Sequence, residues 1–449
     1  MKRLIINVIF ILIVSVGISQ NMAYISTEKA IADINYMIKN IEDIHYNPYF
    51  KIEKQYFDKS VKATLSTFDR DSIPLKTFIA SSMKLSALLS GGHTGLDWQN
   101  DKIFPELISY QFLPFTGKLI KDNTVFKVTR SINDKIPVGI ELTEINGFSI
   151  VELYKECMSF IGGVNTFKNA NCERLFPLYL FFTDKLKAPY NIYLTDRTIS
   201  LKGINVQELN DFLVNGNSID NYTFEIIDDN IGLISYNSCT DYSAFEVFLS
   251  KTFSEIDDKK INKLIIDIRE NSGGDSKLND LLLSYITTKP YRQSSGRFWK
   301  VSSQAKVAYK KNNYSKHHGK SFMEYYYNKE SGTIIEDFDS ELINPIKPSF
   351  YFTGKTCVLI GPKTFSSANF LADAVKTYNL STLIGTSTGE LTNDFGELID
   401  FKLPYSGNIV YVSSTYDIGA KGNPKLFEPV YPDINTYNDA LQYAIKWIE

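Results

Sequence analysis

Ser366 stands at a position where a serine hydroxyl can act as a nucleophile. The apolar residues of segment 356–361 predict a buried strand that ends at the turn residues Gly361 and Pro362. From Ser367 onward, apolar residues recur at spacings of three and four, which predicts an amphipathic helix. Backbone N–H groups and the helix dipole would stabilise an oxyanion formed beside Ser366. The alternative is that Ser366 or Ser367 only caps the helix, as serine commonly does.

A glycine loop in residues 261–284 could present further N–H groups to the same oxygen. An apolar strand pattern stops at Arg269, and Gly273 and Gly274 follow before a helical pattern resumes. Because glycine lacks a Cβ atom, the chain can turn sharply there and approach a ligand oxygen closely. We interpret Gly273 or Gly274 as an oxyanion donor.

His93 is the candidate base, because it follows two glycines at the end of a helix-like apolar pattern. His45 lies in an aromatic stretch, and His317 and His318 lie in a polar, lysine-rich stretch that is typical of a solvated loop. A lone histidine is more often structural than catalytic, but a Gly-Gly-His turn is a poor place for a core histidine. Imidazole ordinarily titrates near pH 6.5, so its neutral form can accept a hydroxyl proton and return it.

Together the three segments resemble the tail-specific, or C-terminal-processing, serine peptidases, in the branch that includes the tricorn protease core. LIIDIRENSGG is similar to that family's strand and glycine loop, TFSSAN to its nucleophile turn, and GGHTGL to its Asp-Gly-His-Thr turn with glycine in place of aspartate. The resemblance continues through IGTSTGE, FKLPYSGNIVYVSST and PVYPDI. It implies a multidomain α/β protein with an N-terminal helical domain, a PDZ-like α+β domain and an α/β catalytic core of crotonase-like (ClpP-like) type.

The resemblance also implies roles for individual residues. Ser366 is similar to the family nucleophile, and Ser367 would supply an oxyanion N–H group together with Gly273 or Gly274. Many members use a lysine base on the strand past the next glycine turn, but that place here reads Gly389-Glu390-Leu391-Thr392. This departure favours the tricorn-like arrangement, in which a histidine such as His93 is the base. Glu428 is the expected third group, with Asp394 as its substitute.

Ser387 lies in the sequence Gly385-Thr386-Ser387-Thr388-Gly389, which fits the G-x-S-x-G pattern of the α/β-hydrolase nucleophile elbow. An elbow must lead directly into a helix, whereas the residues after Gly389 have no helical apolar spacing. No histidine follows position 318, although an elbow serine needs one later in the chain. We therefore interpret Ser387 as a turn residue.

The chain divides by pattern into four parts. Residues 1–19 begin Met-Lys-Arg and continue as an apolar run that ends in small residues, which predicts a signal peptide and export to a periplasmic or extracellular location, with an uncleaved anchor as the alternative. Residues 20–99 show helical spacing. Residues 100–220 mix strands and helices in a pattern similar to a PDZ-like domain, or alternatively an α+β spacer. Residues 221–449 alternate strands and helices, as an α/β core does.

Composition excludes several classes of protein. A net charge of −3 and the lack of a basic stripe argue against nucleic-acid binding. Apart from the leader, no long apolar run predicts a membrane span. The four cysteines are too scattered for a metal or redox motif, although they permit disulfides, and no HExxH or EF-hand pattern occurs, so we expect no cofactor and no catalytic metal.

The sequence thus predicts an exported serine peptidase that cleaves polypeptides through an acyl-enzyme. Cleavage near substrate C-termini is one interpretation of the resemblance. We expect its activity to rise with pH through about 6 to 7, because His93 must lose a proton to act as base. The alternative is an inactive protein that binds a peptide or an apolar ligand on the same scaffold. The chain also resembles the interphotoreceptor retinoid-binding proteins, and that resemblance implies such a binding function.

Overall fold

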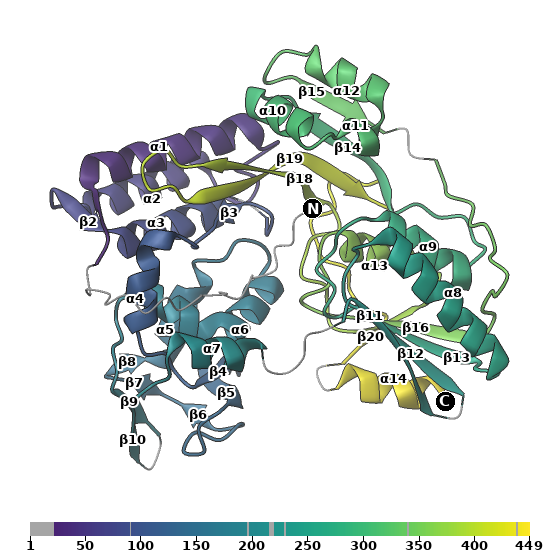
Figure 1. Ribbon diagram of the computed structural model, residues 1–449, viewed down its shortest axis with the longest axis horizontal. Coiled ribbons are helices and arrows are strands. Elements are labelled where there is room, and N and C mark those ends of the chain that lie inside the picture. The colour runs from purple at the N-terminus through teal and green to yellow at the C-terminus, as the bar shows by residue number, and fades with distance from the viewer. Residues whose placement is uncertain are drawn as a thin grey trace.

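The computed structural model describes residues 22–89, 91–194, 197–214, 220–228, 230–338, 341–436 and 439–449. The predicted signal peptide, residues 1–19, lies outside these ranges. The described chain is a mixed α/β structure, as the sequence predicts. Figure 1 shows an upper layer of helices and two long strands that bridges two lower bodies.

The first helices form because apolar residues recur on one face. In α1 (Thr27–Ile44), Ala30, Ile34, Met37 and Ile41 are all buried at helical spacing, and the Ser26 hydroxyl caps the helix by accepting a hydrogen bond from the Lys29 N–H group. The remaining elements of this part are β1 (Tyr24–Ser26), α2 (Lys54–Ser66), β2 (Ser72–Pro74), α3 (Leu75–Leu88) and β3 (Gly95–Leu96). Strands β1 and β2 pair with each other, and β3 follows the third helix, α3.

The next part of the chain contains two small antiparallel sheets, with orders β4-β5-β6 and β10-β9-β7-β8. Asn146 and Gly147 both take positive φ in the turn between β7 and β8, and helix α5 follows β8 directly. The elements are η1 (Asp101–Ile103), α4 (Phe104–Ser109), β4 (Phe115–Ile120), β5 (Val125–Ser131), β6 (Glu141–Leu142), β7 (Glu144–Ile145), β8 (Phe148–Ser149), α5 (Ile150–Met158), α6 (Asn165–Thr183), β9 (Tyr190–Tyr193), β10 (Thr198–Leu201) and α7 (Val206–Val214).

A six-stranded sheet with the order β11-β12-β13-β16-β17-β20 forms the third part. Its strands are parallel from β12 onward, and apolar side chains on both faces are covered by helices. The elements are β11 (Tyr222–Asp228), β12 (Ile231–Tyr236), α8 (Tyr242–Asp258), β13 (Lys263–Asp267), α9 (Lys277–Ile286), β16 (Lys355–Ile360), α13 (Ser367–Tyr378), β17 (Thr382–Gly385), β20 (Ile434–Asn435) and α14 (Ala440–Ile448).

A second sheet, with the order β15-β14-β19-β18, links this part to the N-terminal helices. Its long strand β19 pairs with β3 and packs on α1 (Figure 1). This pairing fixes the position of the chain just before β3 relative to the second sheet. The elements are β14 (Ser294–Lys300), α10 (Ser303–Lys311), α11 (Ser315–His318), α12 (Lys320–Tyr327), β15 (Ile334–Asp337), β18 (Asp394–Lys402) and β19 (Ile409–Gly419).

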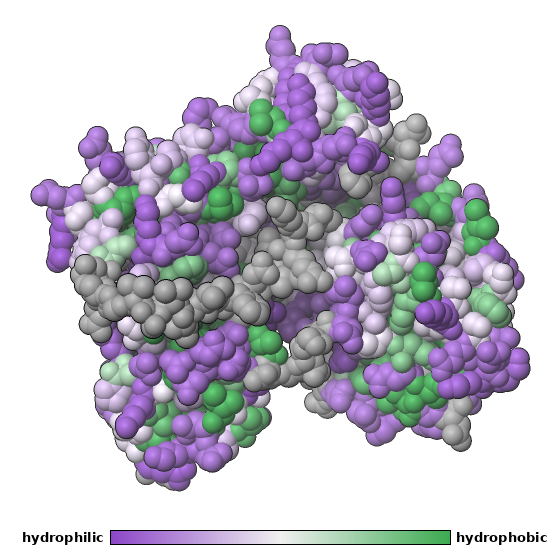
Figure 2. Space-filling model, in the orientation of Figure 1, coloured by the Kyte–Doolittle hydropathy of each residue, from purple (hydrophilic) through white to green (hydrophobic). Residues whose placement is uncertain are grey.

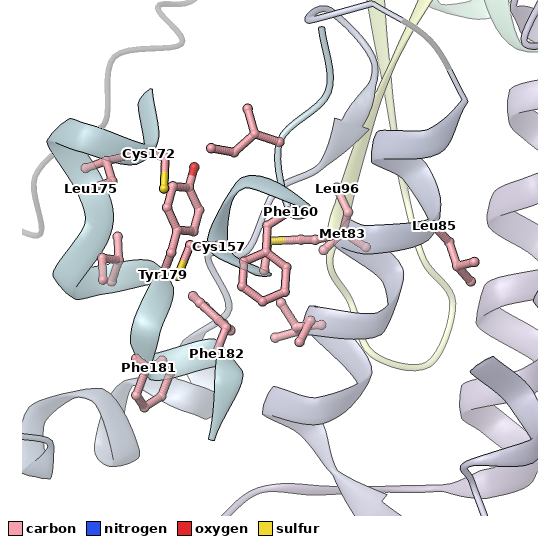
Figure 3. Packing of buried hydrophobic residues seen from close by; sticks show 14 of the residues in the cluster. Met83, Leu85, Leu96, Cys157, Phe160, Cys172, Leu175, Tyr179, Phe181 and Phe182 are labelled. Atoms are coloured by element: carbon pink, nitrogen blue, oxygen red, sulfur yellow. The ribbon is translucent and has the colours of Figure 1, made fainter. Parts of the chain in front are cut away.

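One continuous hydrophobic cluster joins the N-terminal helices to residues 100–214 and to the second sheet. Figure 3 shows part of it, where Met83 and Leu96 face Phe160 and Phe182. Cys157 and Cys172 are free thiols within this cluster, and Cys239 and Cys357 are free and buried elsewhere, so the disulfides that the cysteine count permits are not formed.

The surface shown in Figure 2 is mostly hydrophilic. On the face shown in Figure 2, hydrophilic side chains predominate and hydrophobic ones gather in small groups. No helix within the described ranges combines the length and the apolar composition that crossing a membrane requires.

Candidate active site

Ser366 lies at the N-cap position of α13 in an unusual backbone conformation. Its φ is 54° and its ψ is −126°, a region that costs a residue with a side chain about 1–3 kcal/mol. Its side chain makes no capping hydrogen bond to the helix. The alternative interpretation, in which Ser366 only caps the helix, is therefore wrong, and its hydroxyl has no hydrogen-bond partner among the described residues.

Hydrogen bonds to neighbouring loops hold the Ser366 turn. The Phe365 N–H group donates to the Asn271 carbonyl at 3.0 Å, and the Gly389 N–H group donates to the Thr364 carbonyl at 3.1 Å. The Ser366 N–H group itself donates to Oε2 of Glu390. The strained conformation is thus fixed from two sides.

The glycine loop packs directly against this turn. A Cβ atom added to Gly273 would lie 2.6 Å from the Ser366 Cβ and 2.9 Å from the Ser367 nitrogen. The Ser367 hydroxyl donates to the Gly274 carbonyl at 2.7 Å, which ties the loop to the helix. A side chain at position 273 would therefore displace Ser366, which explains the glycine there.

The structure separates the two glycine candidates for the oxyanion donor. The Gly273 N–H group donates to Asn271 Oδ1 at 2.9 Å, so it is already occupied. The N–H groups of Gly274 and Ser367 have no acceptor among the described residues. Gly273 is therefore corrected to a packing role, whereas Gly274 and Ser367 keep N–H groups that an oxyanion could use.

The Gly-Gly-His turn brings His93 to the same place. The His93 ring lies 4.6 Å from the ring of Phe365, the residue that precedes Ser366. A Cβ atom at Gly92 would come within 2.7 Å of the Phe365 ring, and one at Gly91 would come within 2.7 Å of Asp394 Oδ1. Both glycines are needed for this close approach. Gly91 stands where the resembling turn has an aspartate, and the carboxyl group of Asp394 lies beside it.

Glu390 is the acid beside His93, where the sequence predicted Glu428. Nδ1 of His93 lies 2.8 Å from Oε1 of Glu390, whose side chain is only 2% exposed. Neither atom makes a hydrogen bond to any other group in the described part of the chain. Glu428 has an exposed side chain, and its backbone carbonyl accepts hydrogen bonds from the N–H group and hydroxyl of Thr392. The interpretation of Glu428 as the third group is therefore corrected to Glu390.

A signal for Glu390 was present in the sequence. It lies where many members of the family that the sequence resembles have a lysine base. A functional side chain was therefore to be expected there. Asp394, the predicted substitute for Glu428, also belongs to the site. The ligand atoms of His93, Glu390 and Asp394 all lie within 4.8 Å of one another.

Burial controls the charges of these three groups. It lowers the pKa of His93 below its ordinary value of 6.5, although Asp394 and Asp417 act in the opposite direction. It raises the pKa of Glu390 to about 8, against hydrogen bonds from Asp394 and from the Ser366 N–H group. Burial and the neighbouring Glu390 raise the pKa of Asp394 well above its ordinary value. The site therefore favours a neutral imidazole and protonated carboxyl groups near neutral pH.

Lys51 completes the charge pattern, and no sequence signal pointed to it. Residue 51 as a whole is exposed, but partial burial of its ammonium group lowers its pKa, while Asp394 and Glu390 raise it. Lys168 lies close enough to Lys51 that their mutual repulsion, after burial, lowers the pKa of Lys168. Lys51 thus borders the two carboxyl groups, and Lys168 lies near Lys51.

Ser387 and two lysines close to Ser366 in sequence have other contacts or surroundings. Ser387 follows β17 and leads through a turn into strand β18 rather than into a helix, so it is not an elbow nucleophile. Lys363 pairs with Glu270 at 2.8 Å, and Lys376 pairs with Asp433. Neither lysine is directed to Ser366.

The model of peptidase family S41 matches residues 230–435, which carry Ser366, Gly274, Glu390 and Asp394. The chain is accordingly a serine-type peptidase that acts on polypeptides, and the inactive binding protein considered as the alternative is not favoured. His93 lies outside the matched segment, and its place in the site rests on the contacts described above. No curated protein matches the chain in sequence.

Solved structures of low identity share the fold. The structure of mature CPAF complexed with lactacystin is 15% identical, with a TM-score of 0.64 over 94% of this chain and 97% of CPAF. A CPAF mutant is also 15% identical, with a TM-score of 0.67 over 94% and 96% of the two chains. The photosystem II D1 C-terminal processing protease is 12% identical, with a TM-score of 0.44 over 93% and 97%. At such identities the CPAF structures show the fold alone.

Proposed function

We propose that the protein is an exported serine peptidase that cleaves polypeptides through an acyl-enzyme formed on Ser366. The observation that carries the proposal is the position of Glu390, whose two carboxylate oxygens contact the Ser366 N–H group and His93 Nδ1. One buried side chain thereby fixes both the nucleophile turn and the imidazole. The proposal assigns nucleophile, base and orienting acid to Ser366, His93 and Glu390.

The proposed reaction follows the usual order of acyl transfer. As Ser366 Oγ attacks the scissile carbonyl, its proton moves to the imidazole of His93, which then gives a proton to the leaving amine. The tetrahedral oxyanion accepts hydrogen bonds from the N–H groups of Gly274 and Ser367. A water molecule then releases the acyl group by the same steps in reverse.

Glu390 would select the tautomer that this reaction needs. If the proton of neutral His93 is on Nδ1, directed toward Glu390 Oε1, then Nε2 has a free lone pair to accept the serine proton. When the imidazole becomes charged, an ionised Glu390 stabilises it across 2.8 Å. Burial strengthens this interaction because little solvent screens it.

The proposed domain layout follows the sequence prediction. Residues 1–19 would be a signal peptide that directs export, 20–99 a helical domain that carries the base, 100–220 a PDZ-like domain and 221–449 a crotonase-like catalytic core. The strand, Asn-Gly turn and helix of β7, β8 and α5 support the PDZ-like proposal, and the parallel sheet with helices on both faces supports the proposed core. A preference for sites near substrate C-termini would follow if the PDZ-like part binds peptide tails.

A fluorophosphonate probe followed by peptide mapping tests the proposal. Wild type should be labelled on Ser366, and Ser366→Ala should lose the label while keeping its circular dichroism spectrum and melting temperature. Label on Ser387 would instead support an elbow nucleophile. A folded wild-type chain that takes no label would contradict the assignment of Ser366.

A further inference from the structure

The histidine and carboxyl groups of the site have an arrangement that proton transfer alone does not require. One ligand atom from each of His93, Glu390 and Asp394 can be chosen so that all three lie within 4.8 Å of one another. Among the described residues this is the only group of three histidine, cysteine or acidic side chains that is so compact. The three come from the turn before β3, the turn before β18 and the start of β18, so the fold rather than local sequence brings them together.

Two atoms at the centre of this group have unused hydrogen-bonding capacity. His93 Nδ1 and Glu390 Oε1 are buried and make no well-aligned hydrogen bond with the described residues, although they lie 2.8 Å apart. Glu390 is 2% exposed and Asp394 is 6% exposed. Buried polar atoms without such partners are uncommon in native proteins and call for a ligand, an ion or a proton between them.

The donor set matches a particular class of cation. One imidazole nitrogen and two carboxylate oxygens suit Zn²⁺ and similar divalent transition metals, whereas Ca²⁺ and Mg²⁺ prefer oxygen ligands alone. Zn²⁺ bonds of about 2.0–2.1 Å place neighbouring ligand atoms about 3.3 Å apart in a tetrahedron. Separations between 2.8 Å and 4.8 Å reach that geometry through small side-chain rotations.

We propose that His93, Glu390 and Asp394 bind one Zn²⁺ ion or a similar divalent transition-metal ion, and that the bound ion inhibits the peptidase reversibly. The inhibition rests on the proposed function, whereas the binding does not. An ion on Nδ1 leaves the second imidazole nitrogen carrying its proton, so His93 can no longer accept a proton from Ser366. The same ion would also withdraw Glu390 from its role beside the imidazole.

Lys51 provides an internal check on this proposal. Its ammonium group interacts electrostatically with both Glu390 and Asp394, so it is a positive charge that competes with an incoming cation. Removing this charge in Lys51→Met should tighten Zn²⁺ binding by several fold. A cation bound elsewhere on the surface would not respond in this way.

Equilibrium titration of the full, chelator-stripped chain with ZnCl₂, in competition with a chromogenic zinc chelator, tests the binding. Wild type and Ser366→Ala should each bind one equivalent with the same affinity, because the serine hydroxyl is not among the three ligands. Asp394→Asn should weaken binding about 100-fold or more, since loss of a supporting group alone commonly costs 10- to 100-fold. His318→Gln is the matched control, because His318 also faces a glutamate but belongs to no three-ligand group, and it should bind as wild type does.

The rate of fluorophosphonate labelling at Ser366 tests the inhibition separately. Zn²⁺ should slow labelling of wild type with the half-saturation found in the titration, and EDTA should restore the rate. Lack of stoichiometric binding, or equal weakening in Asp394→Asn and His318→Gln, would overturn the site. If Asp394→Asn melts below the assay temperature, Glu390→Gln takes its place. Zinc binding with an unchanged labelling rate would overturn the inhibition, and zinc binding by a chain that the probe never labels would contradict the proposed function instead.

Discussion

Two histidine–glutamate pairs, each at most 21% exposed, differ in how their charge is balanced. In the first, His93 Nδ1 lies 2.8 Å from Glu390, and among the described residues neither Glu390 nor the adjacent Asp394 has an arginine partner. In the second, His318 Nε2 lies 3.2 Å from Glu397, whose Oε1 also lies 2.7 Å from Arg297. The same two residue types thus occur with and without a permanent positive charge.

The pKa values of the two glutamates show the effect of that charge. Burial alone would raise the pKa of Glu397, but hydrogen bonding to His318 and the charge of Arg297 lower it to about 2. Burial raises the pKa of Glu390 to about 8. A glutamate held ionised at all ordinary pH values is a structural ion pair, whereas one that titrates near neutrality can take part in proton transfer or receive a cation.

The contacts of the second pair agree with a structural role. His318 packs edge-on against Trp299 with ring centroids 4.9 Å apart, and Arg297 lies over the same indole at 5.1 Å. Arg297 also pairs with Asp417 on β19 at 2.8 Å. The cluster therefore fastens helices α10 to α12 onto the sheet that carries Asp394.

Glu390→Gln gives the largest expected difference between the two pairs. Above pH 8, where Glu390 is ionised, the change removes the negative charge that stabilises the His93 imidazolium, so kcat/KM should fall about 10³- to 10⁴-fold, as in other triads that lose their acid. Glu397→Gln should lower kcat/KM of the folded fraction by less than about tenfold. Peptide hydrolysis, normalised to folded protein by circular dichroism, measures both. Equal losses would contradict the distinction.

Arg297→Met should reverse the comparison, with a large effect on stability and a smaller one on activity. It leaves Glu397 and Asp417 buried without their cation, which typically costs about 3–5 kcal/mol of unfolding free energy. Denaturant unfolding followed by tryptophan fluorescence measures this loss. Lys363→Met removes an exposed pair with Glu270 and is the control, with an expected change under about 1 kcal/mol.

Gly274→Ala tests the oxyanion donor. Gly274 has a φ of 144°, and an added Cβ would lie 2.1 Å from the Cys239 carbonyl oxygen, so the loop must move and its N–H group must leave its present position. Loss of one oxyanion donor should lower kcat about 10²- to 10³-fold. Gly332→Ala has a similarly positive φ but open space around its Cβ, so it shares the backbone strain without the displacement. Comparable losses of kcat in both variants would argue for strain alone.

The pH profile gives the smallest effect and sharpens the comparison. His93 is neutral above its pKa, which burial lowers from the ordinary value of 6.5, so the acid limb should lie at lower pH than an exposed imidazole would give. Glu390 ionises only as pH rises through about 8, so kcat/KM should rise by about tenfold per pH unit below 8 and level off above it. In Glu390→Gln that upper step should disappear while the acid limb remains. The measurements need EDTA, so that bound metal does not add its own pH dependence.

Stability should respond to pH in the opposite sense. Because the folded-state pKa of Glu390 is raised above its ordinary value of 4.5, the folded chain binds more protons than the unfolded chain between about 4.5 and 8. This group therefore reduces stability as pH rises through that window. Glu390→Gln should raise the melting temperature at pH 8.5 and change it little at pH 4.5, as differential scanning calorimetry would show.

The elements around Ser366 could be predicted from sequence because their signals are local. Apolar spacing and turn residues were enough to place the strand before Ser366 and the helix after it, and the Gly-Gly-His turn indicated His93. The third group could not be chosen between Glu428 and Asp394, because the contact depends on how the turn after β17 packs beneath the Ser366 turn. Glu390 stood at a recognisable place, but nothing in the sequence shows that its two oxygens reach both His93 and Ser366. Likewise, only the fold shows that the Gly273 N–H group is taken by Asn271.

The most direct test compares the rate constant for fluorophosphonate labelling of Ser366 in His93→Gln and His318→Gln. Both changes remove an imidazole beside a buried glutamate, but only His93 belongs to the group that lacks a compensating arginine. We predict that His93→Gln slows labelling by about 10⁴-fold or more, whereas His318→Gln stays within about twofold of wild type. Similar rates in the two variants, with both chains folded, would contradict the assignment of His93 as the base.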